Sequence, residues 1–252
     1  MPLSRPVALI TGAARRIGAG VARLLHAEGY DLALHYRYSA TEMEVLVTEL
    51  NARRADSAIS LRADLAEFDR LPELIASTIG RFGRLDALVN NASGFFPTPF
   101  GQATPQHWDA LFAANARAPF FLSQAAAPHL QATHGAIVNI AVIHAERPLR
   151  DHALYGMSKA ALLHMTRALA AELAPDVRVN AVSPGAILWP DTDTDKGEDE
   201  DDKAKAALLA RTPMKRIGTV EEIAEAVRWL VRDATYTTGQ IIRVDGGRLL
   251  ES

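Results

Sequence analysis

Tyr155 and Lys159 are the residues of this sequence whose types and spacing most directly indicate acid–base chemistry. Side chains four positions apart lie on one face of an α-helix, so a phenol and an ammonium at this spacing can reach the same point. A neighbouring ammonium favours the phenolate and lowers the pKa of a tyrosine from about 10. The pair is therefore a candidate proton donor. A packed tyrosine beside a solvated lysine is the alternative.

A glycine turn near the start of the chain is a second candidate site. The apolar run 7–10 is followed by TGAARRIGAG at 11–20 and then by a helical pattern, which predicts a strand, a turn and a helix. Such a turn presents backbone N–H groups to a pyrophosphate, and Gly12 leaves room for its approach. An ordinary strand-to-helix turn is the alternative. Arg16 stands where such a turn usually has its middle glycine.

The residues after the second expected strand, 31–36, indicate which dinucleotide would bind. A site for NAD has an acid at this end to accept from the ribose hydroxyls, whereas a 2′-phosphate needs cations or small donors. The sequence has Arg37 and Ser39 there, and Asp31 lies at the opposite end of the strand. This pattern predicts NADPH, with a surface role for Arg37 as the alternative. Asp64, after the third strand, is a candidate acceptor for the adenine amino group or a surface turn residue.

Three further positions follow expected strands or lie in an expected helix. Asn91 comes after the apolar run 85–89, at the edge where ligands bind to a parallel sheet, although asparagine is also a common turn residue. Phe95 belongs to an aromatic loop and could stack on a flat heterocycle or pack onto the domain. Asn115 lies in a helical pattern despite a propensity roughly 0.7 kcal/mol below that of alanine, which suggests a specific role.

These residues need a scaffold, and the pattern of the whole chain predicts one. Short apolar strands alternate with amphipathic helices over seven rounds, without an interior linker or repeat. The expected strands are 7–10, 31–36, 58–61, 85–89, 136–141, 177–182 and 240–244. The prediction is a single α/β domain over residues 1–252, built on a Rossmann-type, doubly wound, seven-stranded parallel sheet with helices on both faces.

Composition and charge limit the classes of partner. The 252 residues carry a net charge of -3, of which -7 comes from eight acids and one lysine between Asp191 and Asp202, so the rest sums to +4. Neither value is typical of a nucleic-acid surface. The segment 190–203 is expected to be a mobile acidic loop near the substrate, without a metal. No signal-peptide pattern and no apolar run of roughly 18 residues occurs, so we expect no membrane segment and a cytoplasmic location.

Several motifs together resemble the short-chain dehydrogenase/reductase family in order and approximate spacing along almost the whole chain. They are TGxxxRIG at 11–18, Asn90-Asn91-Ala92-Ser93, Asn115, Tyr155-x-x-x-Lys159 and Ser183-Pro184-Gly185. The resemblance implies that Tyr155 supplies a proton, that Lys159 holds the cofactor's ribose, and that Asn115 supports a proton-relay water. It also implies a homotetramer or dimer built from the helices around 115–129 and 152–173.

A narrower resemblance is to the pteridine reductases of that family, carried by the glycine turn with its arginine, by His35-Tyr36 and Ser39-Ala40, by LNARR at 50–54 and by NNASGFFPTP at 90–99. It implies that Arg16 touches both cofactor and pterin, and that Phe95 sandwiches the pterin against the nicotinamide. The implied residues are Tyr155, Lys159 and Asn115 for catalysis; Gly12, Arg16, Ile17, Gly18, Tyr36, Arg37, Ser39, Asp64, Leu65, Asn91, Ala92, Lys159, Pro184 and Gly185 for the cofactor; and Arg16, Ser93, Phe95 and Tyr155 for the substrate.

Val142 departs from the family pattern. The family usually has a serine thirteen residues before the tyrosine, and pteridine reductases have an aspartate there, but valine can neither donate nor accept a hydrogen bond. Three interpretations stay open. Tyr155 works with Lys159 and a water alone, His144 or Asp151 takes over the missing role, or the protein binds without turnover. Because Asp151 directly precedes the helix of the tyrosine, it is also the expected N-cap.

The sequence thus predicts an NADPH-dependent reductase of an oxidised pterin or folate, with a dihydropterin or dihydrofolate as substrate by resemblance. A carbonyl or 3-oxoacyl-thioester reductase on the same scaffold is the first alternative. Phe95 and Arg16 count against it, because a flat slot beside a cation suits a heterocycle better than a flexible acyl chain. A non-catalytic NADPH-binding protein is the second alternative, and it rests on Val142.

Overall fold

Seven parallel strands form the sheet of this protein, in the order β3-β2-β1-β4-β5-β6-β7. The computed structural model describes residues 5–187 and 206–251, so the acidic segment 190–203 lies outside the described residues. The strands are β1 Val7–Ile10, β2 Asp31–Tyr36, β3 Ala58–Arg62, β4 Ala87–Asn90, β5 Ala136–Ile140, β6 Arg178–Pro184 and β7 Ile241–Val244. The predicted doubly wound sheet is confirmed, and each strand begins and ends within two residues of its expected position.

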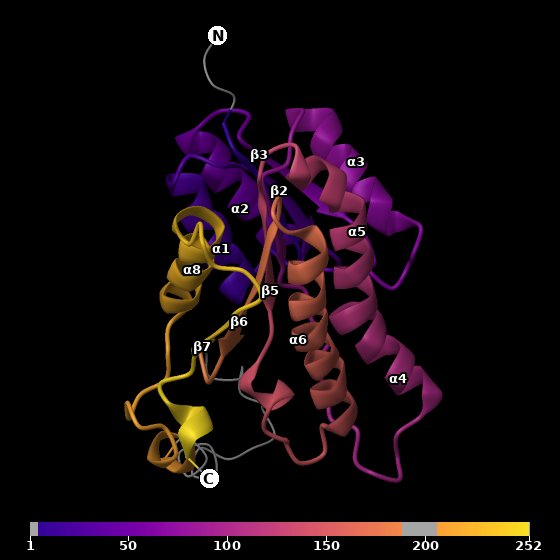
Figure 1. Ribbon diagram of the computed structural model, residues 1–252, viewed down its shortest axis with the longest axis vertical. Helices are drawn as coiled ribbons and strands as arrows, with labels where there is room; N and C mark the ends of the chain where they lie inside the picture. The colour runs from indigo at the N-terminus through magenta and orange to yellow at the C-terminus, as the bar shows by residue number, and fades with distance from the viewer. Residues whose placement is uncertain (1–4, 188–205, 252) are drawn as a thin grey trace.

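Helices cover both faces of the sheet, with α1, α2 and α8 on one face and α3, α5 and α6 on the other (Figure 1). The bounds are α1 Arg16–Ala27, α2 Ala40–Arg53, α3 Arg70–Phe82, α4 Pro105–Phe112, η1 Ala113–Arg117, α5 Ala118–Gln131, η2 Ile143–Ala145, α6 Ala153–Leu173, α8 Val220–Arg228, η3 Trp229–Asp233 and η4 Arg248–Leu250. Residues 206–210 are also helical.

Strand β1 shows how the two layers form. Its side chains alternate between the faces of the sheet, as the two-residue period of a strand requires. Ala8 and Ile10 join the apolar side chains of α1, α2 and α8, whereas Val7 and Leu9 join those of α3, α5 and α6. All four are at most 1% exposed, which explains why this strand reads as a continuous apolar run.

A π-helical turn interrupts the long helix that follows the aromatic loop. Helix α4 begins with a capping box in which the Thr104 side chain accepts from the N–H of His107. The π-helical turn η1 comes directly after α4 and holds the buried Asn115, and α5 follows without a break. Because such turns are rare and frequently occur at functional sites, the π-helical turn supports Asn115 as a candidate site residue.

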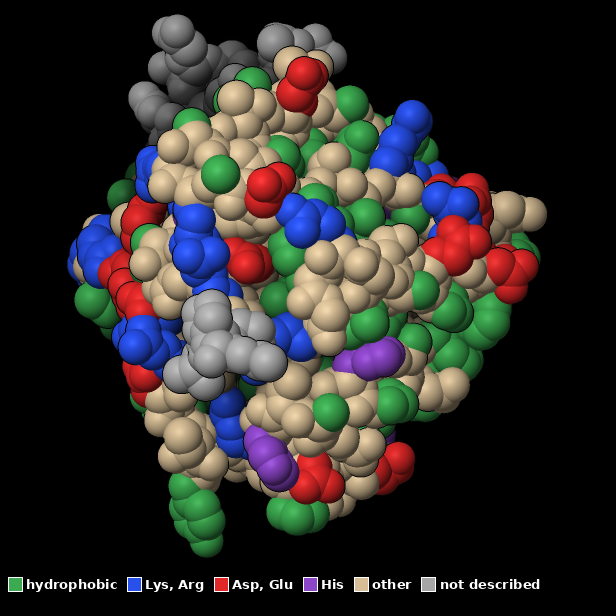
Figure 2. Space-filling view, turned by 90° about the horizontal axis from the view of Figure 1, so that it is seen from above, with side chains coloured by type: hydrophobic (Ala, Val, Ile, Leu, Met, Phe, Trp, Pro, Cys, Tyr) green, Lys and Arg blue, Asp and Glu red, His purple; other side chains and the backbone are tan. Residues whose placement is uncertain are grey.

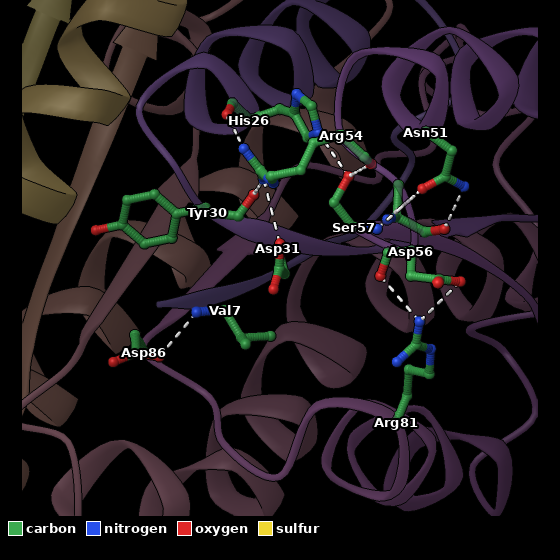
Figure 3. A network of polar contacts seen from close by, with 11 residues as sticks. Val7, His26, Tyr30, Asp31, Asn51, Arg54, Asp56, Ser57, Arg81 and Asp86 are labelled. Atoms are coloured by element: carbon green, nitrogen blue, oxygen red, sulfur yellow. Dashed lines mark hydrogen bonds and ion pairs between the residues drawn. The ribbon is translucent and has the colours of Figure 1, made fainter. Parts of the chain in front are cut away.

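A polar network ties α1, β2 and the connection between α2 and β3 together, away from the candidate site (Figure 3). Arg54 donates to the backbone carbonyls of His26 and Tyr30, and its guanidinium lies 3.2 Å from the Asp31 carboxylate. His26 Nε2 lies 2.7 Å from Ser57 Oγ. Asp31 is therefore engaged at the amino end of its strand and takes no part in a ribose site at the other end.

Charges of both signs are mixed on one face of the molecule. Seen from above, basic and acidic side chains lie next to one another over the face that Figure 2 shows. Within the described ranges, no helix is both long and apolar enough to cross a membrane. The same residues include no group of three His, Asp or Glu side chains that could hold a metal ion.

Candidate active site

The candidate residues meet at the carboxyl ends of the strands. The loops after β1, β4 and β5 and the first turns of α6 lie at the end of the molecule where the C-terminus lies (Figure 1). In an open parallel sheet this is the edge where ligands bind, at the point where the strand order reverses between β1 and β4. The topology thus gathers residues from three distant parts of the chain.

Tyr155 and Lys159 lie in the first two turns of α6, as their spacing predicts. The Tyr155 side chain is buried, and its ring meets the ring of Phe95 edge to face, with 4.8 Å between centroids. Lys159 is 2% exposed, and its Nζ donates to the backbone carbonyl of Ile140 at 2.9 Å, at the end of β5. Both side chains are therefore core residues of the site, so the alternative of a solvated lysine is wrong.

The expected effect of the lysine on the tyrosine is also wrong in this structure. Burial raises the pKa of the Tyr155 phenol to about 12, and a hydrogen bond with Ser93 acts in the opposite direction. Burial lowers the pKa of Lys159 to about 7. Removal from water disfavours the charged form of each group. A lysine that is only partly charged near neutral pH and is bonded to Ile140 contributes little positive potential to the phenol.

Asn115 uses its whole side chain to hold the loop after β4. Its Oδ1 accepts from the N–H of Gly94 at 2.9 Å and from Ser93 Oγ at 3.0 Å, and its Nδ2 donates to the carbonyl of Gly94 at 3.0 Å. The same Nδ2 donates to Ser158 Oγ at 2.9 Å, and Ser158 donates in turn to the carbonyl of Tyr155. Asn115 therefore connects the π-helical turn, the loop and α6.

The glycine turn is fixed to β4 by a small set of hydrogen bonds. Asn91 Nδ2 donates to the carbonyls of Thr11 at 2.9 Å and Gly12 at 2.8 Å, and the backbone N–H groups of Asn91 and Ala92 donate to Thr11 Oγ1. Gly12 has a φ of +61°, and a Cβ there would lie 2.9 Å from Ala92 Cα. A Cβ on Gly18 would lie 2.3 Å from the Gly12 carbonyl oxygen. Side chains at either glycine would separate the turn from the sheet.

Arg16 keeps the backbone conformation that a glycine would adopt at its position. Its φ is +51°, at the first residue of α1. A side chain in the left-handed region costs roughly 1–2 kcal/mol, so the arginine is retained at an energetic cost. Because the turn lies at the amino end of α1, the helix dipole and the guanidinium both favour an anion there.

His35 supports the same turn, a role that its place in the sequence does not predict. The N–H of Gly12 donates to His35 Nδ1 at 3.2 Å, and Nε2 lies 3.1 Å from the carbonyl of Ala63. The backbone partners fix the tautomer, because an N–H needs an acceptor and a carbonyl needs a donor. Burial lowers the pKa of His35 to about 4, so the ring is neutral. The only sequence signal was a histidine inside an apolar strand.

Arg37 and Asp64, predicted for different parts of the dinucleotide, form an ion pair. The guanidinium lies 2.6 Å from Asp64 Oδ2, and the other carboxylate oxygen accepts from the N–H of Ala66 at 2.9 Å. Arg37 also lies over the ring of Tyr38, 4.4 Å from its centroid. The remaining residue of this rim, Ser39, is the N-cap of α2 and makes no capping hydrogen bond with its side chain.

Five other predicted cofactor residues occupy the borders of this region. Ile17, in the first turn of α1, and Tyr36, at the end of β2, are partly buried, and Leu65 is buried after β3. Pro184 ends β6, and the N–H of Gly185 donates to the carbonyl of Val244 at 3.0 Å. A Cβ on Gly185 would lie 2.7 Å from Asp245 Cα, so a glycine is required at this point.

The aromatic loop supplies an open ring beside the tyrosine. Phe95 is 60% exposed and stacks on His152, with 4.8 Å between centroids and 17° between ring planes. Asp151 is not the N-cap of α6; that position is His152, because the Asp151 backbone has a φ of +59° and turns before the helix begins. His144 is half-buried, and its Nδ1 faces the carbonyl of Arg147 at 3.2 Å.

A protein-family model described as Enoyl-(Acyl carrier protein) reductase matches residues 12–248. The chain belongs to the short-chain dehydrogenase/reductase family. It is 38% identical to pteridine reductase 1 of Leishmania tarentolae over 96% of each chain. It is also 38% identical to the granaticin polyketide synthase putative ketoacyl reductase 2 of Streptomyces violaceoruber, over 96% of this chain and 95% of that one.

A third relative is the 3-oxoacyl-(acyl-carrier-protein) reductase FabG of Staphylococcus aureus, 35% identical over 95% of this chain and 96% of its own. The predicted family is thereby confirmed. Because all three relatives are reductases by name, they support an oxidoreductase activity for this member of the short-chain dehydrogenase/reductase family.

Proposed function

We propose that this protein is an NADPH-dependent reductase of an oxidised pterin or folate, which converts a dihydropterin to a tetrahydropterin. The observation that carries the proposal is the exposed Phe95 ring, which stands edge-on to Tyr155 while the Phe95 side chain remains 60% exposed. Aromatic faces favour flat heterocycles, and a flat ring placed against Phe95 would lie next to the proton donor. The pteridine reductase among the relatives supports the same substrate class.

The chain has suitable groups for each part of the cofactor. Gly12 and Gly18 keep the turn close to the sheet at the amino end of α1, which suits a pyrophosphate. Arg37 supplies a cation at the end of β2, which favours the 2′-phosphate of NADPH over an unmodified ribose. The buried Ser183 Oγ has no hydrogen-bond partner in the described structure and lies next to Pro184-Gly185. It therefore leaves a polar atom for a ligand or a water.

The bound nicotinamide supplies the hydride, which leaves the protein to orient the substrate and to deliver the proton. Tyr155 holds that proton firmly because burial raises the pKa of its phenol to about 12. Lys159, held by the carbonyl of Ile140, would bind the ribose and bring positive charge toward the phenol when it is protonated. Asn115 holds the loop and α6 in register through Gly94 and Ser158, and it would support a relay water.

The deciding experiment is steady-state NADPH oxidation with a panel of dihydrobiopterin, dihydrofolate, a 3-oxoacyl thioester and simple ketones. We expect the highest kcat/KM with a dihydropterin and a loss of about 10²–10⁴-fold in Tyr155→Phe, the usual contribution of a positioned general acid. Binding of NADPH, followed by fluorescence, should persist in that variant. Rapid turnover of a ketone or thioester without turnover of any pterin would overturn the assignment.

The ketoacyl reductases among the relatives favour a second candidate, the reduction of a 3-oxoacyl thioester. The two candidates differ at Phe95 and Arg16, which a flat heterocycle would contact and a flexible acyl chain would not need. Phe95→Ala should therefore reduce kcat/KM for a pterin by about 10-fold, comparable to the loss of one aromatic stacking contact, and leave thioester reduction nearly unchanged. The reverse pattern would favour the thioester.

Val142 keeps a third candidate open, an NADPH-binding protein without turnover. It predicts fluorescence changes with NADPH but no oxidation of NADPH with any member of the panel. In that case Val142→Asp, which introduces the carboxylate that pteridine reductases carry at this position, should create measurable turnover. Continued inactivity of Val142→Asp would show that the valine is not the reason.

We also propose that copies of the chain associate through α5 and α6 as a dimer or tetramer. Phe120 on α5 and Met157 on α6 are large apolar side chains that are 40% and 49% exposed. Closed two-fold symmetry is the common solution for such faces. Light scattering behind size exclusion would give the molar mass, and Phe120→Lys should shift it toward that of a single chain of 27.3 kDa.

A further inference from the structure

One face of the Phe95 ring is covered by a histidine. The imidazole of His152 stacks on this face, with 4.8 Å between centroids and 17° between ring planes. The centroid of Tyr155 lies 4.8 Å from that of Phe95 and 6.5 Å from that of His152. A triangle with these sides has nearly a right angle at Phe95, so Tyr155 lies beside the phenyl ring and not over its opposite face. Neither neighbour covers that opposite face, which explains how Phe95 remains 60% exposed.

The position of His152 is fixed by the chain around it. Its Nδ1 lies 2.8 Å from the carbonyl oxygen of Arg150, and because a carbonyl can only accept, Nδ1 carries the proton and donates. The backbone N–H of His152 donates to the carbonyl of Leu149 at 3.2 Å, and its own carbonyl accepts from the N–H of Gly156 at 2.9 Å. Both the backbone and the ring of His152 are therefore held at the start of α6.

Phe95 has less support from its own backbone. It belongs to residues 91–99, which form neither a helix nor a strand. The N–H of Thr98 donates to the carbonyl of Asp151 at 2.5 Å, and this bond ties the loop to the turn before α6. A backbone bond three residues away does not set the direction of the phenyl ring, whereas the stack with His152 does.

We infer that His152 is a positioning residue for Phe95 and reserves one face of the phenyl ring for a flat substrate. With the imidazole on one face and Tyr155 at the edge, a heterocycle can stack only on the remaining face. There it lies next to the proposed proton donor. The substrate in this inference rests on the proposed function, whereas the hold of His152 on Phe95 does not depend on it.

The stack favours binding by pre-organisation. A phenylalanine side chain that is free to rotate in a loop loses rotamer freedom when a ligand fixes it, and this loss opposes binding. His152 already restricts the Phe95 ring in the free protein, so less freedom is lost when the substrate binds. Because His152 acts through Phe95, its removal should weaken substrate binding without slowing the chemical step.

The first test compares His152→Asn with His152→Phe. Asparagine can donate to the Arg150 carbonyl and is a favoured N-cap but has no ring, whereas phenylalanine keeps a ring and cannot donate. We expect His152→Asn to raise the KM for a dihydropterin about 5-fold with little change in kcat, and His152→Phe to stay near the wild type. His134→Asn makes the same change at a side chain that is 78% exposed, and it should match the wild type.

A double variant shows whether His152 acts through Phe95. Phe95→Ala combined with His152→Asn should lose no more affinity for the dihydropterin than Phe95→Ala alone, because the histidine then has no ring to position. Additive losses would overturn the inference. Equal rises in KM for His152→Asn and His152→Phe would also overturn it, since the bond to Arg150 and not the stack would then be responsible.

A further measurement needs no turnover. With 4-fluorophenylalanine at position 95, the ¹⁹F resonance should move toward that of the free amino acid in His152→Asn, stay displaced in His152→Phe and be unchanged in His134→Asn. A resonance that does not respond to His152→Asn would overturn the inference. A resonance that moves as expected in a protein that reduces no pterin would overturn the proposed function and support the hold of His152 on Phe95.

Discussion

At the scale of single residues, burial decides the chemistry of this site more than sequence spacing does. Tyr155 and Lys159 are correctly placed on one face of a helix, yet both are removed from water and both shift toward their neutral forms. A lysine held in this way is costly to the fold, so its presence argues for a use. Residues kept against stability commonly serve function.

The first prediction concerns this cost. The pKa of Lys159 is lowered to about 7 in the folded protein, whereas in the unfolded chain it keeps its ordinary value of 10.5. Between these values the unfolded state binds more protons, so the free energy of unfolding rises with pH across this window. Lys159→Met should therefore be more stable than the wild type at pH 7 by a few kcal/mol, and this advantage should shrink by about 2 kcal/mol at pH 9.

Urea unfolding of both proteins at the two pH values, at one fixed chain concentration, gives the difference directly. The same variant should lose most of its reductase activity, because methionine cannot donate to a ribose hydroxyl. If the stability advantage of Lys159→Met stays constant from pH 7 to pH 9, the pKa of Lys159 is not lowered by folding and the prediction is wrong.

The second prediction concerns the choice of dinucleotide. Arg37→Ala should weaken NADPH binding about 10-fold and leave NADH binding nearly unchanged, since only the 2′-phosphate needs the cation. The effect is modest because Asp64 already pairs with the guanidinium and half of the Arg37 side chain is exposed. Fluorescence titration with both nucleotides measures it. Arg81→Ala, which removes an exposed arginine near Asp56, is the matched control.

At the scale of elements, the βα turn after β1 combines a strained arginine with a rigid support. Arg16 adopts a φ of +51°, while Asn91, Thr11 and His35 fix the turn from three directions. Strain of this kind persists only where the surroundings determine the conformation. The turn is therefore pre-shaped before any ligand arrives.

The third prediction separates the strain from the charge. Arg16→Gly and Arg16→Ala both remove the guanidinium, but only glycine tolerates the left-handed conformation at low cost. Arg16→Gly should be up to about 1 kcal/mol more stable than Arg16→Ala, while both lose affinity for NADPH. Midpoints of urea unfolding and nucleotide titrations of the two variants test the two halves separately. Equal stability would mean that the turn relaxes when arginine is absent.

At the scale of the whole molecule, two buried histidines make the free energy of unfolding depend on pH. His35 supports the glycine turn, and His26 lies in the polar network around Arg54 and Ser57 at the opposite end of β2 (Figure 3). Burial lowers the pKa of each, in the case of His35 to about 4. Protonating His35 would also place a donor against the N–H of Gly12.

The fourth prediction is a loss of stability in mild acid. As pH falls from 6.5 toward 4, the unfolded chain takes up protons that the folded His35 resists, so the free energy of unfolding falls. His35 alone should contribute about 2 kcal/mol of this loss at pH 4.5. His35→Asn, which can still accept from Gly12, should remove that contribution, as seen by urea unfolding at pH 7 and pH 4.5. His134→Asn, at a position with 78% side-chain exposure, should keep the acid response of the wild type.

The sequence by itself determined the order of the elements and the positions of most candidate residues. Strand and helix patterns are local, and parallel strands place their carboxyl ends at one edge, so Gly12, Asn91 and Tyr155 had to meet there. The sequence also shows directly that no acid follows β2 and that an arginine lies in the glycine turn, because both observations concern only which residue type occupies a position. Val142 was likewise visible as a missing partner.

Only the tertiary structure decided how these residues act on one another. The pairing of Arg37 with Asp64 and the support of Gly12 by His35 join residues that are distant in the chain and carry no shared pattern. The pKa shifts of Tyr155 and Lys159 depend on how deeply α6 is covered, which no spacing records. Local periodicity fixes which face a side chain occupies, whereas burial and long-range contacts fix its charge and its partner.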